Sequence, residues 1–179
     1  MHLGVKRGEV KLLPYSPQWA EAFNEEKENL SNIFGITVLQ IEHIGSTAVP
    51  GLMAKPLIDM AILIERLQHL AEPIIAELMA SSYQERVGRL MGRQRVFAKG
   101  DDESITHHLH IIELGEADWE HKLLFRNALI RDEALRKSYH HLKIKLSKDF
   151  AQDRARYTAA KANFIREVLE NYSRTNSNA

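Results

Sequence analysis

Apolar residues in the first third of the chain follow first a helical and then an extended period. They recur at helical spacing from Trp19 to Phe34, and Gly35 is a typical residue for the end of that helix. Residues 37–44 are rich in β-branched and apolar side chains, which predicts a strand. Residues 57–64, LIDMAILI, are apolar almost throughout, which is the pattern of a strand buried on both faces.

The rest of the pattern predicts a helix, two strands and then helices only. A helix is expected within residues 67–81, and residues 94–99 and 106–114 have the pattern of two strands joined by a glycine-containing hairpin turn. The period is helical from there on. The expected helices are residues 117–131, one capped by Asp132 and one that follows Asp153.

This order of elements predicts an α+β fold, with a mixed sheet as its core, flanking helices and a helical C-terminal half. The chain has 179 residues, which suits one hydrophobic core better than two. We therefore expect a single domain over residues 1–179, with loose ends at about residues 1–9 and 173–179.

Composition argues against several classes of function. Lysine and arginine number 24, as do aspartate and glutamate, so the domain has no overall basic field. General nucleic-acid binders and proteins of anionic membranes depend on such a field, and we expect neither partner. The absence of cysteine excludes disulfides, thiolate metal sites and a cysteine nucleophile. The N-terminus lacks the pattern of a signal peptide, and no stretch approaches the roughly 20 apolar residues of a membrane span. These features predict a cytoplasmic domain.

The first candidate for chemistry is the Gly45-Ser46 pair at the end of the first predicted strand. A glycine there lets the backbone turn tightly and brings backbone N–H groups and a hydroxyl close to a ligand. That arrangement suits phosphate oxygens. The alternative is a turn without a ligand, which is the more frequent use of such a pair.

Asp59 is the one acidic residue in the apolar strand over residues 57–64. A carboxylate is expensive to bury unless something pairs with it. In the structural alternative, Asp59 caps a loop or pairs with Lys55. In the functional one, the ends of the two strands share a cleft, with a phosphate at Gly45 and a metal-binding carboxylate at Asp59.

Two histidines share one face of the last predicted strand. Residues two apart in a strand point to the same side, so His108 and His110 point together, opposite to His107. Two imidazoles on one face suit half of a metal site or a pair of phosphate contacts. The alternative is that they are core histidines with satisfied hydrogen bonds.

Two cations lie in the apolar stripes of predicted helices. Lys161 falls in the stripe of the last helix, and Arg126 falls in that of the helix over residues 117–131. A long cationic side chain can bury its stem and keep its charged head in water. The functional alternative is that both heads reach an anionic ligand in the cleft.

Four strings closely resemble the GrpB family: EHIGSTAVPGLMAKPLIDM, HHLHIIE, LLFRNAL and YTAAKANFIREVL. They occur in order, and the resemblance covers about residues 10–172. GrpB proteins are grouped with the nucleotidyltransferase superfamily, whose members move a nucleotidyl group from a nucleoside triphosphate to an acceptor. The resemblance therefore implies a nucleotidyltransferase-like fold and a nucleotide or phosphate ligand.

The superfamily pattern is a Gly-Ser or Gly-Gly pair after a strand, two acidic residues spaced one apart on the next strand, and a third on a later strand. Gly45 and Ser46 match the first element, and Asp59 matches the first acidic position. The second acidic position falls on Ala61, which cannot bind a metal. The later strand carries histidines where the third carboxylate is expected.

The resemblance implies that Asp59 is the catalytic and metal-binding carboxylate. His108, His110 and Glu42 would complete the site for a divalent ion, either Mg²⁺ or a transition metal. The residues expected to bind the phosphates are Gly45, Ser46, Lys55, Arg126 and Lys161.

Three functions are consistent with these residues. The favoured hypothesis is a protein that binds a nucleoside triphosphate with a divalent metal and transfers a nucleotidyl group to an acceptor that the sequence does not identify. The first alternative, favoured by Ala61, is a regulatory module that binds a nucleotide or phosphate without catalysis. The second is a metal-dependent phosphohydrolase that uses the histidine pair.

Overall fold

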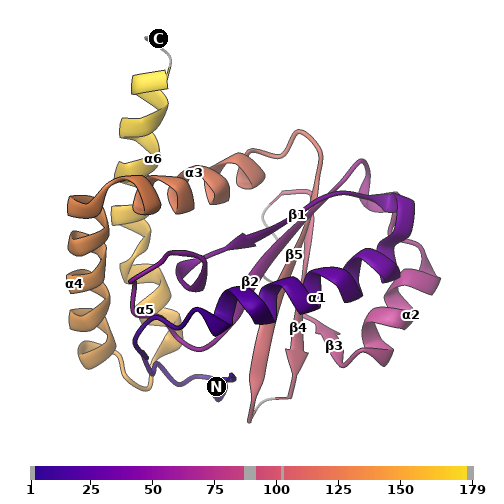
Figure 1. The fold of residues 1–179 in the computed structure, drawn as a ribbon, viewed down its shortest axis with the longest axis horizontal. Helices are drawn as coiled ribbons and strands as arrows, with labels where there is room; N and C mark the ends of the chain where they lie inside the picture. Colours follow the sequence, from indigo (N-terminus) through magenta and orange to yellow (C-terminus); the bar gives the residue numbers. More distant parts are fainter. Residues whose placement is uncertain (1–2, 87–91, 102, 177–179) are drawn as a thin grey trace.

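The computed structural model has a five-stranded mixed sheet at its centre (Figure 1). It describes residues 3–86, 92–101 and 103–176. The strands, in spatial order, are β1 (Val38–Ile44), β2 (Ile58–Ile64), β5 (Ile105–Glu113), β4 (Gln94–Gly100) and β3 (Tyr83–Glu85). β2 and β5 are parallel, and the other neighbours in the sheet are antiparallel.

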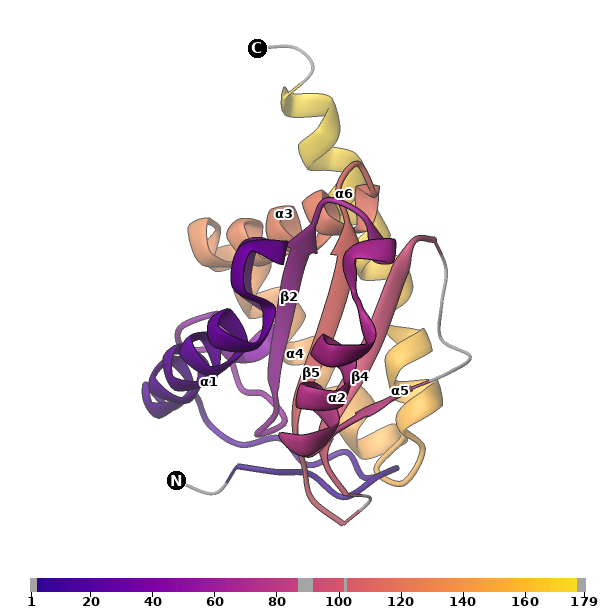
Figure 2. The same ribbon diagram turned by 90° about the vertical axis from the view of Figure 1, so that its right-hand side faces the viewer.

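Six α-helices surround the sheet within the described residues. They are α1 (Gln18–Phe34), α2 (Glu72–Ala80), α3 (Ala117–Arg131), α4 (Glu133–Asp149), α5 (Arg154–Ala160) and α6 (Ala162–Asn176). Figures 1 and 2 show α1 and α2 on one side of the sheet, with α4, α5 and α6 on the other. No described helix is long and apolar enough to cross a membrane.

The alternation of side chains along β2 divides the interior into two parts. Ile58, Met60 and the other even-numbered residues pack with Leu109 of β5 into the main core, beneath α1 and α2. Ala61 and Leu63 point to the opposite face, where they pack with Trp119 of α3. β2 is thus buried on both faces as predicted, and Asp59 lies on the face turned away from the main core.

A further apolar cluster anchors the C-terminal helices beside the end of β1. Val49 and Leu52, from the loop after β1, pack against Leu129 of α3 and Tyr139 of α4. Phe164 of α6 joins this cluster through a stacked contact with the Tyr139 ring. The packing holds α4 and α6 against the loop that follows the Gly-Ser turn, and so brings Lys143 of α4 and Lys161, which precedes α6, near that turn.

The predicted α+β fold is confirmed, with three differences in detail. β3 was not predicted, because a strand of three residues is too short to show a period. The last predicted helix is two helices, α5 and α6, which meet at Lys161. Val5 is buried and pairs with Ile105, so the packed part of the chain begins before residue 9. At the other end, α6 continues to Asn176.

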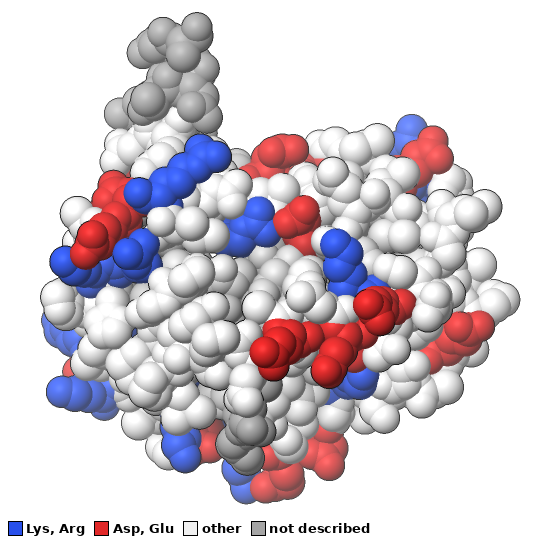
Figure 3. Space-filling view, viewed as in Figure 1, with Lys and Arg blue, Asp and Glu red and all other residues white. Residues whose placement is uncertain are grey.

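Charged side chains of both signs are interspersed over the face of the molecule that Figure 3 shows, without a broad basic area. This distribution agrees with the equal numbers of acidic and basic residues in the sequence. A local concentration of positive charge nevertheless exists, and it lies in a cavity.

Candidate functional site

The Gly45 turn lies directly against Asp59. β1 ends at Ile44, whose register partner on β2 is Asp59, and the backbone of Gly45 then has φ 70°. A Cβ atom at Gly45 would lie 2.5 Å from Oδ2 of Asp59. Glycine is therefore required here both for the positive φ and for the close approach. Ser46 opens the short 3₁₀ turn η2 (Ser46–Ala48) immediately afterwards.

Asp59 and His108 are neighbours across the parallel strands β2 and β5. Nδ1 of His108 lies 3.2 Å from Oδ1 of Asp59, and Nε2 of His108 lies 3.1 Å from Nη2 of Arg154. A guanidinium group only donates hydrogen bonds, so Nε2 accepts and Nδ1 carries the proton that is donated to Asp59. Both ring nitrogens of His108 thus have protein partners.

The ionised form of Asp59 is favoured in this setting. Burial alone would raise its pKa, but the hydrogen bond with His108 and the positive charges nearby outweigh burial and hold the pKa well below its ordinary value. The carboxylate is therefore negatively charged throughout the neutral range, and it faces the cavity described below.

His110 shares the face of His108, as predicted, but has a different environment. It is the register partner of Ala61, and its Nδ1 is buried without a hydrogen-bond partner among the described residues. Burial is the main cause that lowers the pKa of His110 to about 3. The ring is neutral at physiological pH, and its buried nitrogen is a polar atom for which a ligand or water would be a partner.

Lys143 of α4 is an ammonium group held in the interior. Only 2% of the residue is exposed, and Nζ donates a hydrogen bond to the carbonyl of Met53. Nζ also lies 5.5 Å from the centroid of the Tyr139 ring. Burial lowers the pKa of Lys143 well below its ordinary value, and the positive charges of Lys161 and Lys55 lower it further.

Lys161 lies at the junction of α5 and α6 and turns towards the same region. Its Nζ is 4.4 Å from the centroid of the Tyr157 ring, which is itself buried. Burial lowers the pKa of Lys161 to about 8, opposed by the attraction of Asp59 and assisted by the repulsion of Arg154. The break in the helix at this position thus places a partly desolvated cation close to the Asp59 carboxylate.

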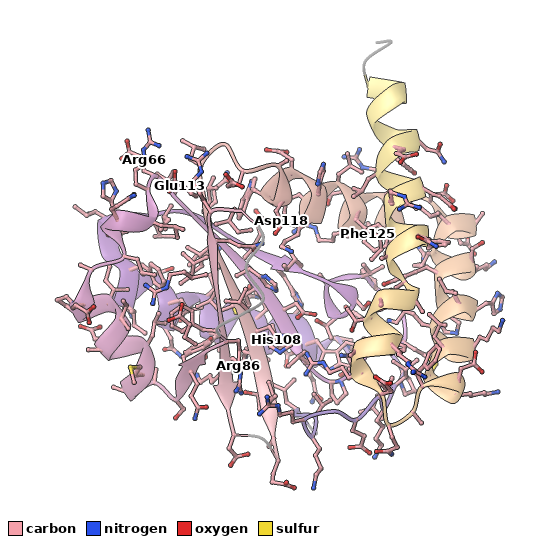
Figure 4. The ribbon with its side chains drawn as sticks, turned by 180° about the vertical axis from the view of Figure 1, so that it is seen from behind. Arg66, Arg86, His108, Glu113, Asp118 and Phe125 are labelled. Atoms are coloured by element: carbon pink, nitrogen blue, oxygen red, sulfur yellow. The ribbon has the colours of Figure 1, made fainter. Side chains whose placement is uncertain are left out.

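These side chains surround a cavity of about 220 Å³, which we call the cationic cavity. Its lining includes Ser46, Lys55, Asp59, Lys143, Arg154 and Lys161. A second cavity of about 350 Å³ adjoins it and shares Ser46, Asp59 and Lys161 with it. We call this second space the apolar cavity, because Phe125, Tyr139, Ile165 and Leu169 contribute to its wall. Figure 4 shows His108 in the strand region below Asp118 and Phe125 of α3.

The predicted residues Arg126 and Glu42 form an ion pair with each other outside these cavities. Nη1 of Arg126 lies 2.6 Å from Oε2 of Glu42 and also donates to the carbonyl of His43 at 2.8 Å. Neither residue is part of the lining of the cationic or the apolar cavity. The structure therefore brings together Gly45, Ser46, Lys55, Asp59, His108, His110 and Lys161, but leaves out Arg126 and Glu42.

The side chains do not fit the divalent metal that the resemblance implies. Among the residues that the structure describes, no group of three or more histidine, aspartate or glutamate side chains is placed to hold a metal ion. Asp59 is the one carboxylate that the described part of the chain places in the cationic cavity, and its Oδ1 is already hydrogen-bonded to His108. Glu42 is engaged by Arg126, and the lining adds cations that would repel a metal. The predicted metal site on Asp59, His108, His110 and Glu42 is therefore not supported.

Several residues of the site were missed at the sequence level. Lys143, Arg154, Tyr139 and Tyr157 all line a cavity but were not predicted. A signal for Lys143 existed, because it lies on α4 between the buried residues Tyr139 and Leu146, one turn from each. Arg154 gives no comparable signal, since an arginine in the first turn of a short helix is an ordinary surface pattern.

The fold is that of the nucleotidyltransferases. A solved structure of a cytoplasmic RNA terminal U-transferase aligns with 76% of this chain and 41% of that chain, with a TM-score of 0.52. The two sequences are 16% identical, so the likeness concerns the fold alone.

Within this fold, the chain belongs to the GrpB family, whose model, described as GrpB protein, matches residues 9–171. The crystal structure of conserved protein GrpB from Enterococcus faecalis is 30% identical, with a TM-score of 0.81, and covers 90% of this chain and 99% of that chain. The resemblance drawn from the four sequence strings is thereby confirmed.

Two relatives show how the chain compares in length. Glutamate-rich protein GrpB from Alkalihalophilus pseudofirmus is 34% identical over 170 residues, which are 93% of this chain and 98% of that protein. UPF0157 protein YqkA from Bacillus subtilis is 35% identical over 173 residues, which are 97% of this chain and 50% of that protein. The chain thus spans nearly all of the first relative and half of the second.

Proposed function

We propose that this protein binds a nucleotide, with its phosphates in the cationic cavity and its base in the apolar cavity. The observation that carries the proposal is the convergence of Lys55, Lys143, Arg154 and Lys161 on one cavity, where the described residues contribute a single carboxylate. Cations that line one cavity repel one another, and a phosphate chain bound among them would offset that repulsion.

The Gly45 turn supports the position of the phosphates. Gly45 has no side chain to obstruct a ligand, and η2 begins at Ser46, a residue that lines both cavities. Phosphate oxygens accept hydrogen bonds from such hydroxyl and backbone N–H groups. The cationic cavity, at about 220 Å³, suits a phosphate chain better than a whole nucleotide.

The apolar cavity supports a ligand with a second, less polar part. Phe125 and Tyr139 offer aromatic surface, and their rings are themselves in edge contact at 5.2 Å between centroids. Asp118, His121 and Lys122 add polar groups to the same wall. A planar base packs against aromatic side chains, while a few polar groups orient it.

The proposal is limited to binding, because the groups for metal-assisted transfer are not assembled. Nucleotidyl transfer in the superfamily pattern relies on three carboxylates, and among the described residues Asp59 alone lines the cationic cavity. A phosphohydrolase based on the histidine pair is also less favoured, since Asp59 and Arg154 already engage both nitrogens of His108. Transfer to an acceptor and a cytoplasmic location stay predictions.

Isothermal titration calorimetry with ADP and ATP tests the proposal directly. We expect saturable binding that Lys161→Met weakens by about tenfold or more, because the variant keeps an apolar stem and loses the charge. Lys137→Met is the matched control, since Lys137 is 68% exposed on α4 and pairs with Glu133. The proposal is wrong if neither nucleotide binds, or if the two variants lose affinity equally.

A further inference from the structure

Basic residues outnumber acidic ones in the lining of the cationic cavity, and this affects which charge state of a ligand can bind. Four of its lining residues, Lys55, Lys143, Arg154 and Lys161, are cationic types, and Asp59 is the one acidic residue. Asp59 is already hydrogen-bonded to His108, so part of its charge is directed away from the lysines. The cavity therefore lacks negative charge, whereas a site for a divalent metal has an excess of it.

Lys143 holds an amino group in the interior beside this cavity, and a bound anion would favour its charged form. The side chain is buried, its amino group contacts the carbonyl of Met53 and the ring of Tyr139, and it also lines the cationic cavity. The Met53 carbonyl accepts a hydrogen bond and the Tyr139 ring makes a cation–π contact, but neither group carries a formal negative charge. A buried ammonium without a counter-ion is unfavourable, and the lowered pKa of Lys143 reflects this cost.

Lys161 approaches the same space from another helix. It lines both cavities. Burial lowers the pKa of Lys161, and the negative charge of Asp59 opposes this shift without cancelling it. Lys143 of α4 and Lys161 at the junction of α5 and α6 thus line the same cavity as Asp59. In metal-dependent phosphoryl-transfer sites, the positive charge at the phosphates is supplied largely by divalent ions.

We propose that the site takes its phosphate ligand as the metal-free anion, with Lys143 and Lys161 supplying the positive charge that a divalent metal supplies in related sites. This inference rests on the proposed function and goes beyond it, because it specifies which form of the ligand binds. It follows from the charge of the lining and from the single available carboxylate, both of which are properties of this chain.

Two consequences distinguish this mode of binding from a metal-dependent one. First, Mg²⁺ neutralises part of a polyphosphate's charge and retains bound water, so the complex suits the small cationic cavity less well than the free anion does. Second, Asp59 repels the ligand instead of binding its metal. Removing that charge with Asp59→Asn is therefore expected to tighten binding of the free anion, whereas a metal site would lose its central ligand.

The test measures binding of pyrophosphate and ADP by isothermal titration calorimetry, in EDTA and in excess MgCl₂ at matched ionic strength. We expect affinity for both ligands to be about tenfold higher in EDTA than in Mg²⁺, from the difference in ligand charge. Asp59→Asn should bind pyrophosphate in EDTA more tightly than the parent does. Asp153→Asn is its control, because Asp153 caps α5 and is outside the lining of the cationic cavity.

The outcomes separate the two proposals. Absence of binding in both buffers would overturn the proposed function and this inference together. Binding that requires Mg²⁺, or that is equal or tighter with Mg²⁺, would overturn the inference and leave the proposed function intact. If Asp59→Asn fails to fold, the comparison of Lys161→Arg with Lys161→Met decides instead. Lys161→Arg keeps the charge and should still bind more tightly in EDTA than in MgCl₂, whereas Lys161→Met should lose this difference.

Discussion

Asp59 of β2 and His108 of β5 are register partners, and Oδ1 of Asp59 lies 3.2 Å from Nδ1 of His108. The contact joins the two strands on the face that carries the cavities. Since Arg154 donates to the other ring nitrogen, Nδ1 of the imidazole is the donor to the carboxylate. This pair gives Asp59 a structural partner without a metal, and it makes the stability of the protein sensitive to acid.

We expect Asp59→Asn to reduce the dependence of stability on low pH. The pKa of Asp59 is lowered from 3.8 on folding, so the ionised group contributes stability above about pH 4, and this contribution is lost as the pH falls. The contribution is about 1.5–3 kcal/mol, as for a hydrogen bond to a charged group. Urea denaturation of parent and variant at pH 7 and pH 3 measures it. Equal losses between the two pH values in both proteins would contradict the prediction.

Anion affinity should fall as the pH rises through the titration of Lys161. The pKa of Lys161 is lowered to about 8, so its ammonium form, which attracts the anion, is present below about pH 8 and is lost above it. Sulfate is a suitable probe, because its charge is constant over pH 6.5–9.5. Competition of sulfate with ADP should weaken several-fold over this range in the parent. Lys161→Arg stays charged over this range, so its sulfate affinity should depend less on pH. If its pH dependence equals that of the parent, another group causes the change.

The sheet could be predicted from sequence because its strands have unambiguous patterns. Residues 57–64 are apolar almost throughout, and they form a strand buried on both faces between β1 and β5. The shared face of His108 and His110 followed from the period of two and is confirmed. Such local rules succeed because the backbone geometry of a strand fixes the direction of each side chain.

The contents of the site could be predicted only in part, because they depend on which helices pack against that face. Lys161 was selected for its place in an apolar stripe, and the structure puts it beside the cavities. The same argument for Arg126 did not hold, since Glu42 on the neighbouring strand β1 takes its charge. Lys143 follows the same rule as Lys161, because it lies between the buried residues Tyr139 and Leu146 of α4. No local pattern reveals which charge has a partner elsewhere in the chain.

Replacing Arg126 should separate stability from ligand binding. Its side chain is 16% exposed, and its guanidinium pairs with Glu42 at 2.6 Å and donates to the carbonyl of His43. Arg126→Met leaves Glu42 partly buried without this cation, which should cost about 1–3 kcal/mol in the free energy of unfolding. ADP affinity should stay within about twofold of the parent's, because Arg126 lines neither cavity.

Lys161→Met is the comparison for that variant, with the opposite expectation. It should lose ADP affinity while its free energy of unfolding is unchanged or slightly higher, since a partly desolvated charge is removed. Urea denaturation and calorimetry on both variants give a two-by-two comparison. A large loss of ADP binding in Arg126→Met would show that Arg126 contributes to the ligand site.

Gly45 and Gly51 provide a matched pair that isolates the contact between the turn and Asp59. Both have positive φ, 70° and 78°, so an alanine is strained at either position. A Cβ at Gly45 would lie 2.5 Å from Oδ2 of Asp59, whereas a Cβ at Gly51 would have no atom within 4 Å. Gly51→Ala should therefore cost about 1 kcal/mol in the free energy of unfolding, from backbone strain alone.

Gly45→Ala should cost more than Gly51→Ala, by about 1–3 kcal/mol, because either the turn or the Asp59 side chain must move. The displacement should also weaken ADP binding, since Asp59 and Ser46 line both cavities, while Gly51→Ala should bind normally. Urea denaturation with titration calorimetry on the two variants measures both effects. Equal costs in stability and equal affinities would show that the turn has room for a side chain, and the close packing of Gly45 on Asp59 would then have no role in shaping the site.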